Sequence, residues 1–149
     1  MFFAEVEQAI IDRLIAKMPA GTAVLPVREL ERVPELRQKA PAVFVVFDGY
    51  SVGESIGPTG QIQRVTMEWY VVAMAKSARG NGNTDAARDE ASALCEQVLQ
   101  ALLGFDVGSA SGQGGKFLRL SDAPGPEYDG GMCYVPLAFT NPATFKGQP

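Results

Sequence analysis

The sequence predicts an α+β fold in which an antiparallel β-sheet has two helices packed on one face, in the order helix, strand, strand, helix, strand, strand. Three observations support this prediction. Two segments carry apolar residues at helical spacing, one long segment alternates apolar and polar residues, and the connections within each strand pair are short. The 149 residues are 46% hydrophobic and 20% charged, which is typical of a globular protein, so we expect a single domain over residues 1–149.

The first element is a helix over residues 3–18. Acidic residues near its start and Lys17 near its end suit the helix dipole. Pro19 and Gly21 follow it and are expected to end it. Its apolar positions form one stripe, which predicts that the helix lies flat on a sheet: Phe3, Val6, Ile10, Leu14 and Met18.

The first strand pair is expected to follow a short extended piece, TAVLPVREL, and a polar connection, ERVPELRQK. The apolar run of residues 42–47 predicts a buried strand, and the glycine-rich residues 49–60 predict an exposed loop after it. Residues 61–76 alternate regularly, which predicts a strand with one face in the core. The predicted core face of that strand consists of Val65, Met67, Trp69, Val71 and Ala73.

The second helix is expected to begin near Thr84, after a turn-rich stretch, and to end at Gly104. Its apolar stripe consists of Ala87, Ala91, Leu94, Val98 and Leu102. Residues 106–115 have the glycine and serine content of a flexible linker. Two further strands are predicted over residues 116–122 and 132–140, with a turn segment between them.

The motif with the most direct link to catalysis is GYSVG at residues 49–53, which fits the G-x-S-x-G nucleophile elbow and follows a predicted strand. A serine of this kind needs a histidine to remove its proton, and the chain contains no histidine. The elbow must also lead into a helix, whereas the chain continues ESIGPTG, which predicts a loop. We therefore expect Ser51 to be inert and the chain to have no catalytic residue of this kind.

Two glycine-rich stretches fall short of nucleotide-binding motifs. A phosphate loop in the stretch GQGGK would need glycine in place of Ala110 and serine or threonine in place of Phe117. A dinucleotide fingerprint that begins at Gly80 would need glycine in place of Asp85, where a carboxylate repels a pyrophosphate. The sequence therefore predicts no cofactor.

Paired carboxylates are the remaining candidates for acid/base chemistry: Asp48 with Glu54, and Glu127 with Asp129. Both pairs stand in predicted loops beside glycines, where solvated carboxylates are common. Nothing in the sequence indicates the burial that would shift a pKa there. A small cytoplasmic enzyme that uses these carboxylates stays open as an alternative.

The composition disfavours metal, membrane and nucleic-acid binding. Without histidine, and with Cys95 and Cys133 far apart in the sequence, a metal site would need only carboxylate ligands. Each cysteine is expected to be a buried free thiol. The N-terminus has no basic leader, and no apolar run approaches the length of a membrane span. The net charge of −4 and the scattered basic residues predict no general affinity for DNA.

Five segments spread over the chain resemble the Mu-type tail terminator family of tailed phages and prophages: VEQAIIDRL, PAVFVVFDGYSVGE, WYVVAMAKSAR, EASALCEQVLQALLGF and YVPLAF. The resemblance implies a small α+β protein without enzymatic activity that forms a ring, six-fold in related systems, on the head-proximal end of the tail tube. The ring would stop tube polymerisation and present a surface to the head. The implied partners are other copies of the chain, the tail tube protein and the head–tail connector protein. The implied location is the virion tail, assembled in the host cytoplasm, with DNA passing through the lumen without specific binding.

A ring needs two different patches on each subunit, and we expect them on the loops of residues 49–60, 78–84 and 104–115. Tyr50 is the expected anchor, because tyrosine supplies contact area at low entropic cost. Another head–tail connector or completion protein stays open as an alternative function. The residues expected at an interface are Asp48, Tyr50, Glu54, Arg64 and Arg79.

Overall fold

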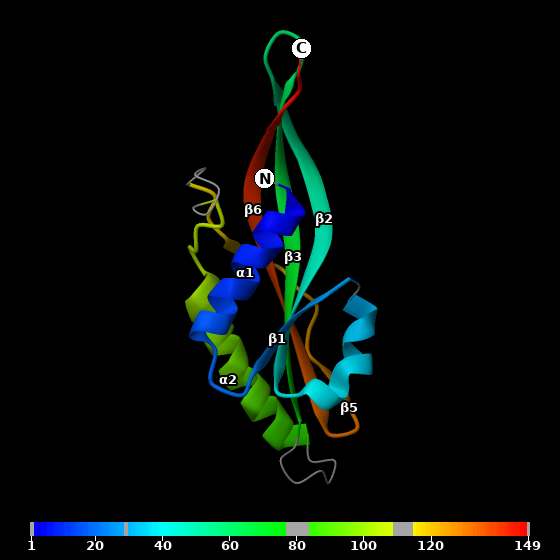
Figure 1. Cartoon of the computed structure of the whole chain (residues 1–149). Helices are drawn as coiled ribbons and strands as arrows, with labels where there is room; N and C mark the ends of the chain where they lie inside the picture. Colours follow the sequence, from blue (N-terminus) through cyan, green and yellow to red (C-terminus); the bar gives the residue numbers. More distant parts are fainter. Residues whose placement is uncertain (1, 29, 77–83, 109–114, 149) are drawn as a thin grey trace.

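The computed structural model describes residues 2–28, 30–76, 84–108 and 115–148, and this part of the chain forms two α-helices and a mixed six-stranded sheet. Figure 1 shows α1 (Phe3–Lys17) and α2 (Thr84–Leu102) on one side of the sheet and the short helical segment η1 (Leu30–Lys39) on the other. The α+β class and the packing of both helices on one face are therefore confirmed. The strands are β1 (Ala23–Val27), β2 (Ala42–Ile56), β3 (Ile62–Lys76), β4 (Arg119–Ser121), β5 (Glu127–Asp129) and β6 (Met132–Lys146).

The sheet has the strand order β1-β2-β3-β6-β4, and β5 also pairs with β6. The predicted antiparallel pairing is confirmed for β2 with β3, for β3 with β6, and for β4 and β5 with β6. β1 departs from the prediction, because it runs parallel to β2 and makes the sheet mixed. Residues 28–41, which include η1, connect β1 to β2 and are long enough for the crossover that a parallel pair requires.

The largest difference from the sequence-based prediction lies in β2. Residues 49–56, predicted as a loop, continue the strand and pair with β3. The glycines do not end the strand, because two β-bulges absorb them: the register shifts between Phe47 and Gly49 and between Val52 and Ser55. Gly49 has a φ of 103°, a left-handed conformation that glycine adopts without steric cost. The chain turns only at residues 57–61.

The last strands also differ from the prediction. β4 is shorter than the predicted residues 116–122, and β6 continues past residue 140 to Lys146. β5 lies inside the predicted turn segment and forms a hairpin with β6. The hairpin turns at Gly130 and Gly131, whose φ values of 55° and 82° suit the two-residue turns that close such hairpins.

Both predicted helix ends are confirmed. Met18 is extended, with a ψ of 156°, as expected of a residue before proline, so α1 ends at Lys17. α2 ends at Leu102, and Gly104 follows with a φ of 73°. The Gly104 N–H donates a hydrogen bond of 3.0 Å to the Leu118 carbonyl, which ties the end of α2 to the segment before β4. The turn predicted before α2 lies outside the described residues.

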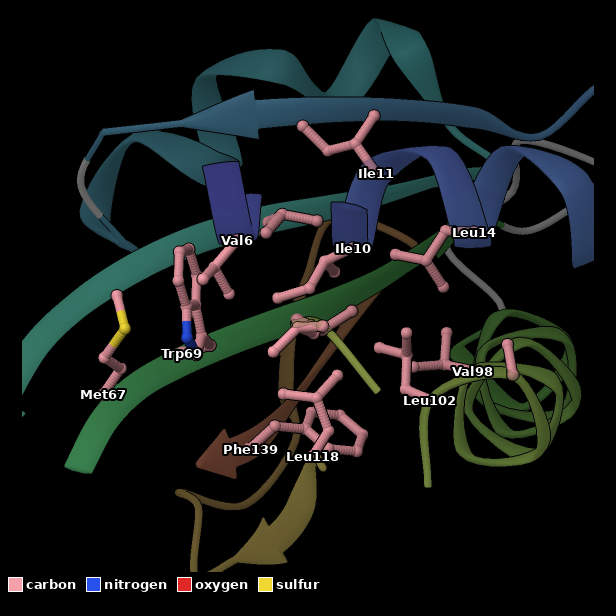
Figure 2. Packing of buried hydrophobic residues seen from close by; sticks show 14 of the residues in the cluster. Val6, Ile10, Ile11, Leu14, Met67, Trp69, Val98, Leu102, Leu118 and Phe139 are labelled. Atoms are coloured by element: carbon pink, nitrogen blue, oxygen red, sulfur yellow. The ribbon is translucent and has the colours of Figure 1, made fainter. Parts of the chain in front are cut away.

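The main core lies between the two helices and the sheet (Figure 2), and the predicted core face of β3 is confirmed. Trp69 is 1% exposed and lies beside Val6 of α1 in the close-up view. Ala73 lies further along β3, in a smaller cluster under α2. The members of the main core that come from both helices and from three strands include Val6, Ile10, Leu14, Val43, Val45, Val65, Met67, Trp69, Val71, Val98, Leu102 and Phe139.

The opposite face of the sheet is covered in part by η1. Val33 and Leu36 of this segment pack with Phe44, Val46 and Met74. The sequence predicted only a polar connection here, because the apolar residues of η1 are separated by charged ones. The run of residues 42–47 is apolar at every position because both of its faces are covered. The main core lies on one face and η1 lies on the other.

Cys95 on α2 and Cys133 on β6 are free and buried, as the sequence predicted. They belong to one small cluster between α2 and the sheet. Burial raises the pKa of the Cys95 thiol to about 11, and the neighbouring Cys133 contributes to the rise. Burial also raises the pKa of the Cys133 thiol. Both thiols therefore stay protonated, and poorly nucleophilic, at neutral pH.

The three longest strands form an arm that extends beyond the helices (Figure 1). β2, β3 and β6 each have 15 residues, and the turn between β2 and β3 lies at the tip of the arm, beside the C-terminus. We define the arm as residues 49–66 and 142–146. α1 begins at the base of the arm, so the part of the arm nearer its tip extends past both helices (Figure 1).

Candidate assembly interface

Tyr50 belongs to an exposed aromatic cluster at the base of the arm. Its ring centroid lies 6.1 Å from that of Phe2, which in turn lies 5.5 Å from Phe3 and 5.2 Å from Phe145. Phe3 stacks on Phe47, with centroids 4.9 Å apart and ring planes 9° from parallel. Tyr50 is 52% exposed, Phe2 41% and Phe3 42%. The cluster therefore presents aromatic surface to solvent, and aromatic residues are enriched at protein interfaces.

The bulge after Phe47 determines the side on which Tyr50 lies. Two residues three positions apart in a regular strand face opposite sides of the sheet. Here Phe47 pairs with Trp69 and Tyr50 pairs with Met67, so the extra residue between them brings both side chains to the helix side. Val52 follows on the same side and is 69% exposed.

Glu54 and Arg64, both predicted interface residues, are brought together across the hairpin of β2 and β3. Arg64 Nη1 lies 3.8 Å from Glu54 Oε2, and both side chains are well exposed. A pair of this kind contributes at most about 1 kcal/mol, so it shapes the surface more than it stabilises the fold. The Gln63 amide donates a hydrogen bond of 2.9 Å to the Gly53 carbonyl and holds the chain beside the second bulge.

Asp48 is not brought to this cluster. Asp48 borders a small hollow of about 80 Å³ that is also lined by Glu68, Tyr70 and Thr140. The neighbours of Trp69 along β3 face the side of the sheet away from the helices, so this hollow lies on the opposite side from Tyr50. Arg79 lies outside the described residues.

The sequence-based prediction missed the residues that surround Tyr50. Phe3 was assigned to the buried stripe of the first helix, and the structure corrects this, because Phe3 is 42% exposed. Phe2, Val52 and Phe145 were not singled out. The available signal was the pair of phenylalanines at the start of a helix with acidic early turns. Large apolar residues at a helix start remain exposed unless another element covers them.

The described residues include few groups arranged for catalysis or metal binding. Ser51 is exposed and pairs with Thr66 inside β2, so it does not stand on a strand-to-helix turn. The described residues contain no group of three or more histidine, cysteine or acidic side chains placed to hold a metal ion. A groove of about 530 Å³ lies beside the aromatic cluster and is lined in part by Glu7 and Arg28. Partial burial raises the pKa of the Glu7 carboxyl, but none of the other described residues that line this groove is a nucleophile or a carboxylate.

No helix in the described part of the chain is long and apolar enough to span a bilayer. β5 contains the second carboxylate pair, Glu127 and Asp129, and both side chains are exposed. Among the described residues, the exposed aromatic cluster around Tyr50 is the feature best suited to contact with another protein.

Comparisons with known proteins agree with this conclusion. The model of the phage tail terminator protein family matches residues 1–147, which confirms the resemblance seen in the sequence. A solved chain from a structure titled "Virion of native gene transfer agent (GTA) particle" is similar over 95% of this chain and 94% of that chain, with a TM-score of 0.56 and 17% identity, which shows a shared fold. The comparison with curated proteins gives no match. Because the family match spans nearly the whole chain, the protein belongs to the phage tail terminator protein family and is a structural protein of the phage tail.

Proposed function

We propose that this protein ends the growth of a phage tail: several copies, six in the simplest case, form a ring on the head-proximal end of the tail tube. The ring blocks addition of further tube subunits and offers its outer surface to the head connector. The function is mechanical, and it requires stable protein contacts and no reaction.

The observation that carries this proposal is the exposed aromatic face at the base of the arm, in a chain whose family is that of tail terminators. Tyr50 and Val52 are 52% and 69% exposed and lie on strand β2, not on a loop. Exposed apolar surface of this kind marks contact sites, because water contact with it is unfavourable. A strand holds the contact residues in fixed positions, as a ring with defined geometry needs.

The charge of the chain supports the passage of DNA through such a ring. The net charge is −4 and the sequence pI is about 4.8, so the protein has no excess of basic residues that would hold phosphates. An acidic protein around the tail lumen would repel the DNA backbone weakly at short range and would let the genome slide. Copies of the chain, the tube protein and the head connector are thus the proposed partners.

A polymerisation assay tests this proposal. Purified tail tube protein is allowed to elongate with and without an excess of this protein, and tube lengths are measured by electron microscopy. We expect short tubes with gold-labelled protein at one end only. Tubes of unchanged length with unlabelled ends would contradict the proposal. Label that appears only at the joint of completed tails with heads would instead support a connector or completion protein.

A further inference from the structure

Phe2 lies just before α1 and is held in place by contacts of its ring. Its backbone is extended, with a φ of −116° and a ψ of −163°, and it makes no side-chain cap hydrogen bond at the start of the helix. The ring centroid of Phe2 lies 5.2 Å from that of Phe145, 6.1 Å from that of Tyr50 and 6.3 Å from that of Phe47. Because the ring is 41% exposed, these aromatic contacts, and not deep burial, determine where Phe2 lies.

Phe2 joins the two outer strands of the arm. Tyr50 belongs to β2 and Phe145 to β6, and β3 lies between these strands in the sheet. Phe145 pairs with Gln63, which stands two residues before the buried Val65, so the Phe145 side chain faces the helix side. Tyr50 faces the same side because of the first bulge in β2. Phe2 therefore spans the helix side of the arm from one outer strand to the other.

Phe3 makes the corresponding contact on the other side of the bulge. Its ring stacks on that of Phe47 at 4.9 Å, and Phe47 is the last residue before the register shift. Tyr50, which Phe2 contacts, comes after the register shift. Two consecutive residues of the N-terminal segment thus contact β2 on both sides of its first bulge.

The base of the arm is where its strands are least regular. A bulge interrupts the ladder of hydrogen bonds and bends its strand. Gly49 in the bulge has a φ of 103°, and no atom of another residue lies within 4 Å of the place that a side chain would occupy. Across β3, the arm part of β6 begins with Pro142, which has no N–H to donate. Gly49 pairs with Glu68 and Pro142 with Thr66, so the two irregular positions lie close to the same height.

The body of the protein supports the arm at few other places. On the face away from the helices, Ser51 and Thr66 are exposed, and η1 packs nearer the other end of the sheet (Figure 1). β1 pairs with residues 42–46 of β2 and β4 pairs with residues 138–140 of β6, so both paired segments end before the arm begins. A sheet of three strands gains its stability chiefly from what packs on it. The contacts of Phe2 are therefore important for the orientation of the arm.

We propose that Phe2 and Phe3 form a strap, which we call the N-terminal strap, that fixes the orientation of the arm relative to the body of the protein. Phe3 holds β2 on the body side of the bulge, and Phe2 holds β2 and β6 on the arm side. Release of Phe2 lets the arm bend at Gly49 and Pro142 while the core beneath α1 stays closed. The inference concerns a single copy of the chain and does not depend on the proposed ring. In such a ring, the strap would determine where the tip of the arm meets its partner.

Hydrogen–deuterium exchange of the purified protein, read by mass spectrometry, tests the strap. Phe2→Ala removes the contacts with Tyr50 and Phe145, so we expect the amides of residues 49–56 and 143–146 to exchange about tenfold faster. Amides of α2 and of residues 42–46 should exchange as they do in the natural protein. Phe2→Tyr keeps the ring and should keep the slow exchange.

A control variant and a second measurement separate the strap from a general effect on stability. Ile15→Ala removes apolar surface that is 61% exposed at the other end of α1, and it should leave exchange in the arm unchanged. Trp69, the single tryptophan of the chain, is 1% exposed, and its ring lies 4.9 Å from that of Phe47. Quenching of its fluorescence by acrylamide should be the same in Phe2→Ala and in the natural protein, because the core stays closed.

Unchanged exchange in the arm of Phe2→Ala would overturn the proposed strap. Faster exchange throughout the chain, with stronger quenching of Trp69, would overturn it as well, because Phe2 would then support the whole core and not the arm. Exchange in Phe2→Tyr as fast as in Phe2→Ala would show that contacts of the ring do not hold the arm.

Discussion

The indole N–H of Trp69 donates a hydrogen bond to Oδ1 of Asn141, 2.9 Å away, inside the core beneath α1. Asn141 is 1% exposed, and its Nδ2 also donates to the Pro142 carbonyl at 3.3 Å and contacts the sulfur of Met67. The bond joins β3 to β6 at the base of the arm. It satisfies both polar groups in a place where an unpaired donor would cost about 1–3 kcal/mol.

The first prediction concerns this pair. Trp69→Ala should lower the free energy of unfolding by about 3–5 kcal/mol, because it leaves a large cavity among residues of five elements. Asn141→Ala should lower the free energy of unfolding by about 1–3 kcal/mol, because it leaves the buried indole N–H without an acceptor. Urea denaturation of Trp69→Phe, Asn141→Ala and the double variant should show that the two losses are not additive. Additive losses, or a loss below about 1 kcal/mol for Trp69→Ala, would contradict the described core.

The second prediction concerns Ser51. The chain has no histidine, and Ser51 is a strand residue paired with Thr66, so its hydroxyl has no general base. Incubation with an excess of a fluorophosphonate probe should leave the intact mass unchanged by mass spectrometry. Stoichiometric labelling at Ser51 would show that this segment is a catalytic site and not part of a contact surface.

The third prediction concerns the buried thiols. Burial raises the pKa of Cys95 from 9.0 to about 11, so the folded state disfavours its thiolate. The contribution of this group to stability is therefore fully present below about pH 9 and is lost as the pH rises toward 11. Urea denaturation at pH 8, 9 and 10 should show a steeper fall for the natural protein than for Cys95→Ala. Equal slopes for the two proteins would mean that Cys95 ionises freely in the fold.

The fourth prediction concerns nucleic acid. With a net charge of −4, the protein should bind duplex DNA more weakly than a Kd of about 10⁻⁴ M at physiological salt. Fluorescence anisotropy with a labelled duplex measures this. Tight binding that weakens steeply with added salt would contradict passive passage of DNA through the ring and would favour a DNA-handling role.

The sequence predicted the parts of the fold that local pattern determines. α1, α2 and β3 each have a regular apolar period over 15 or more residues, and Pro19 and Gly104 end the helices where proline and glycine are expected to. The second half of β2 could not be predicted in this way. Its glycines locally favour a loop. The segment stays extended because it pairs with β3, with two bulges in the pairing, and this is a tertiary contact that local sequence does not report.

The candidate interface was predictable only in part. Tyr50, Glu54 and Arg64 were expected at an interface; they are exposed, but Tyr50 and Glu54 lie on a strand and not on the predicted loop. The rest of the aromatic cluster depends on where α1 begins over the sheet. Phe2 meets Tyr50 and Phe145 only because three distant segments converge, and no local pattern reports such convergence.

The fifth prediction tests the arm directly. Tyr50→Ala combined with Glu54→Lys should leave the fold intact, because both side chains are exposed, yet tail assembly should suffer. A control is Tyr128→Ala with Glu127→Lys on β5, away from the arm; Tyr128 is 48% exposed, although its side chain hydrogen-bonds to Cys133. Circular dichroism melting checks the fold, and phage titre checks assembly. Equal titres for the two double variants would show that the arm is not part of the interface.

The most direct test of the terminator role is the length distribution of tails made without this protein. Particles from a phage or prophage that lacks the gene are imaged by electron microscopy, with a complemented strain as the control. The account predicts tails of uncontrolled length, or tails that fail to join heads, and recovery of uniform, joined tails on complementation. Tails of normal length that join heads in the complete absence of the protein would contradict it.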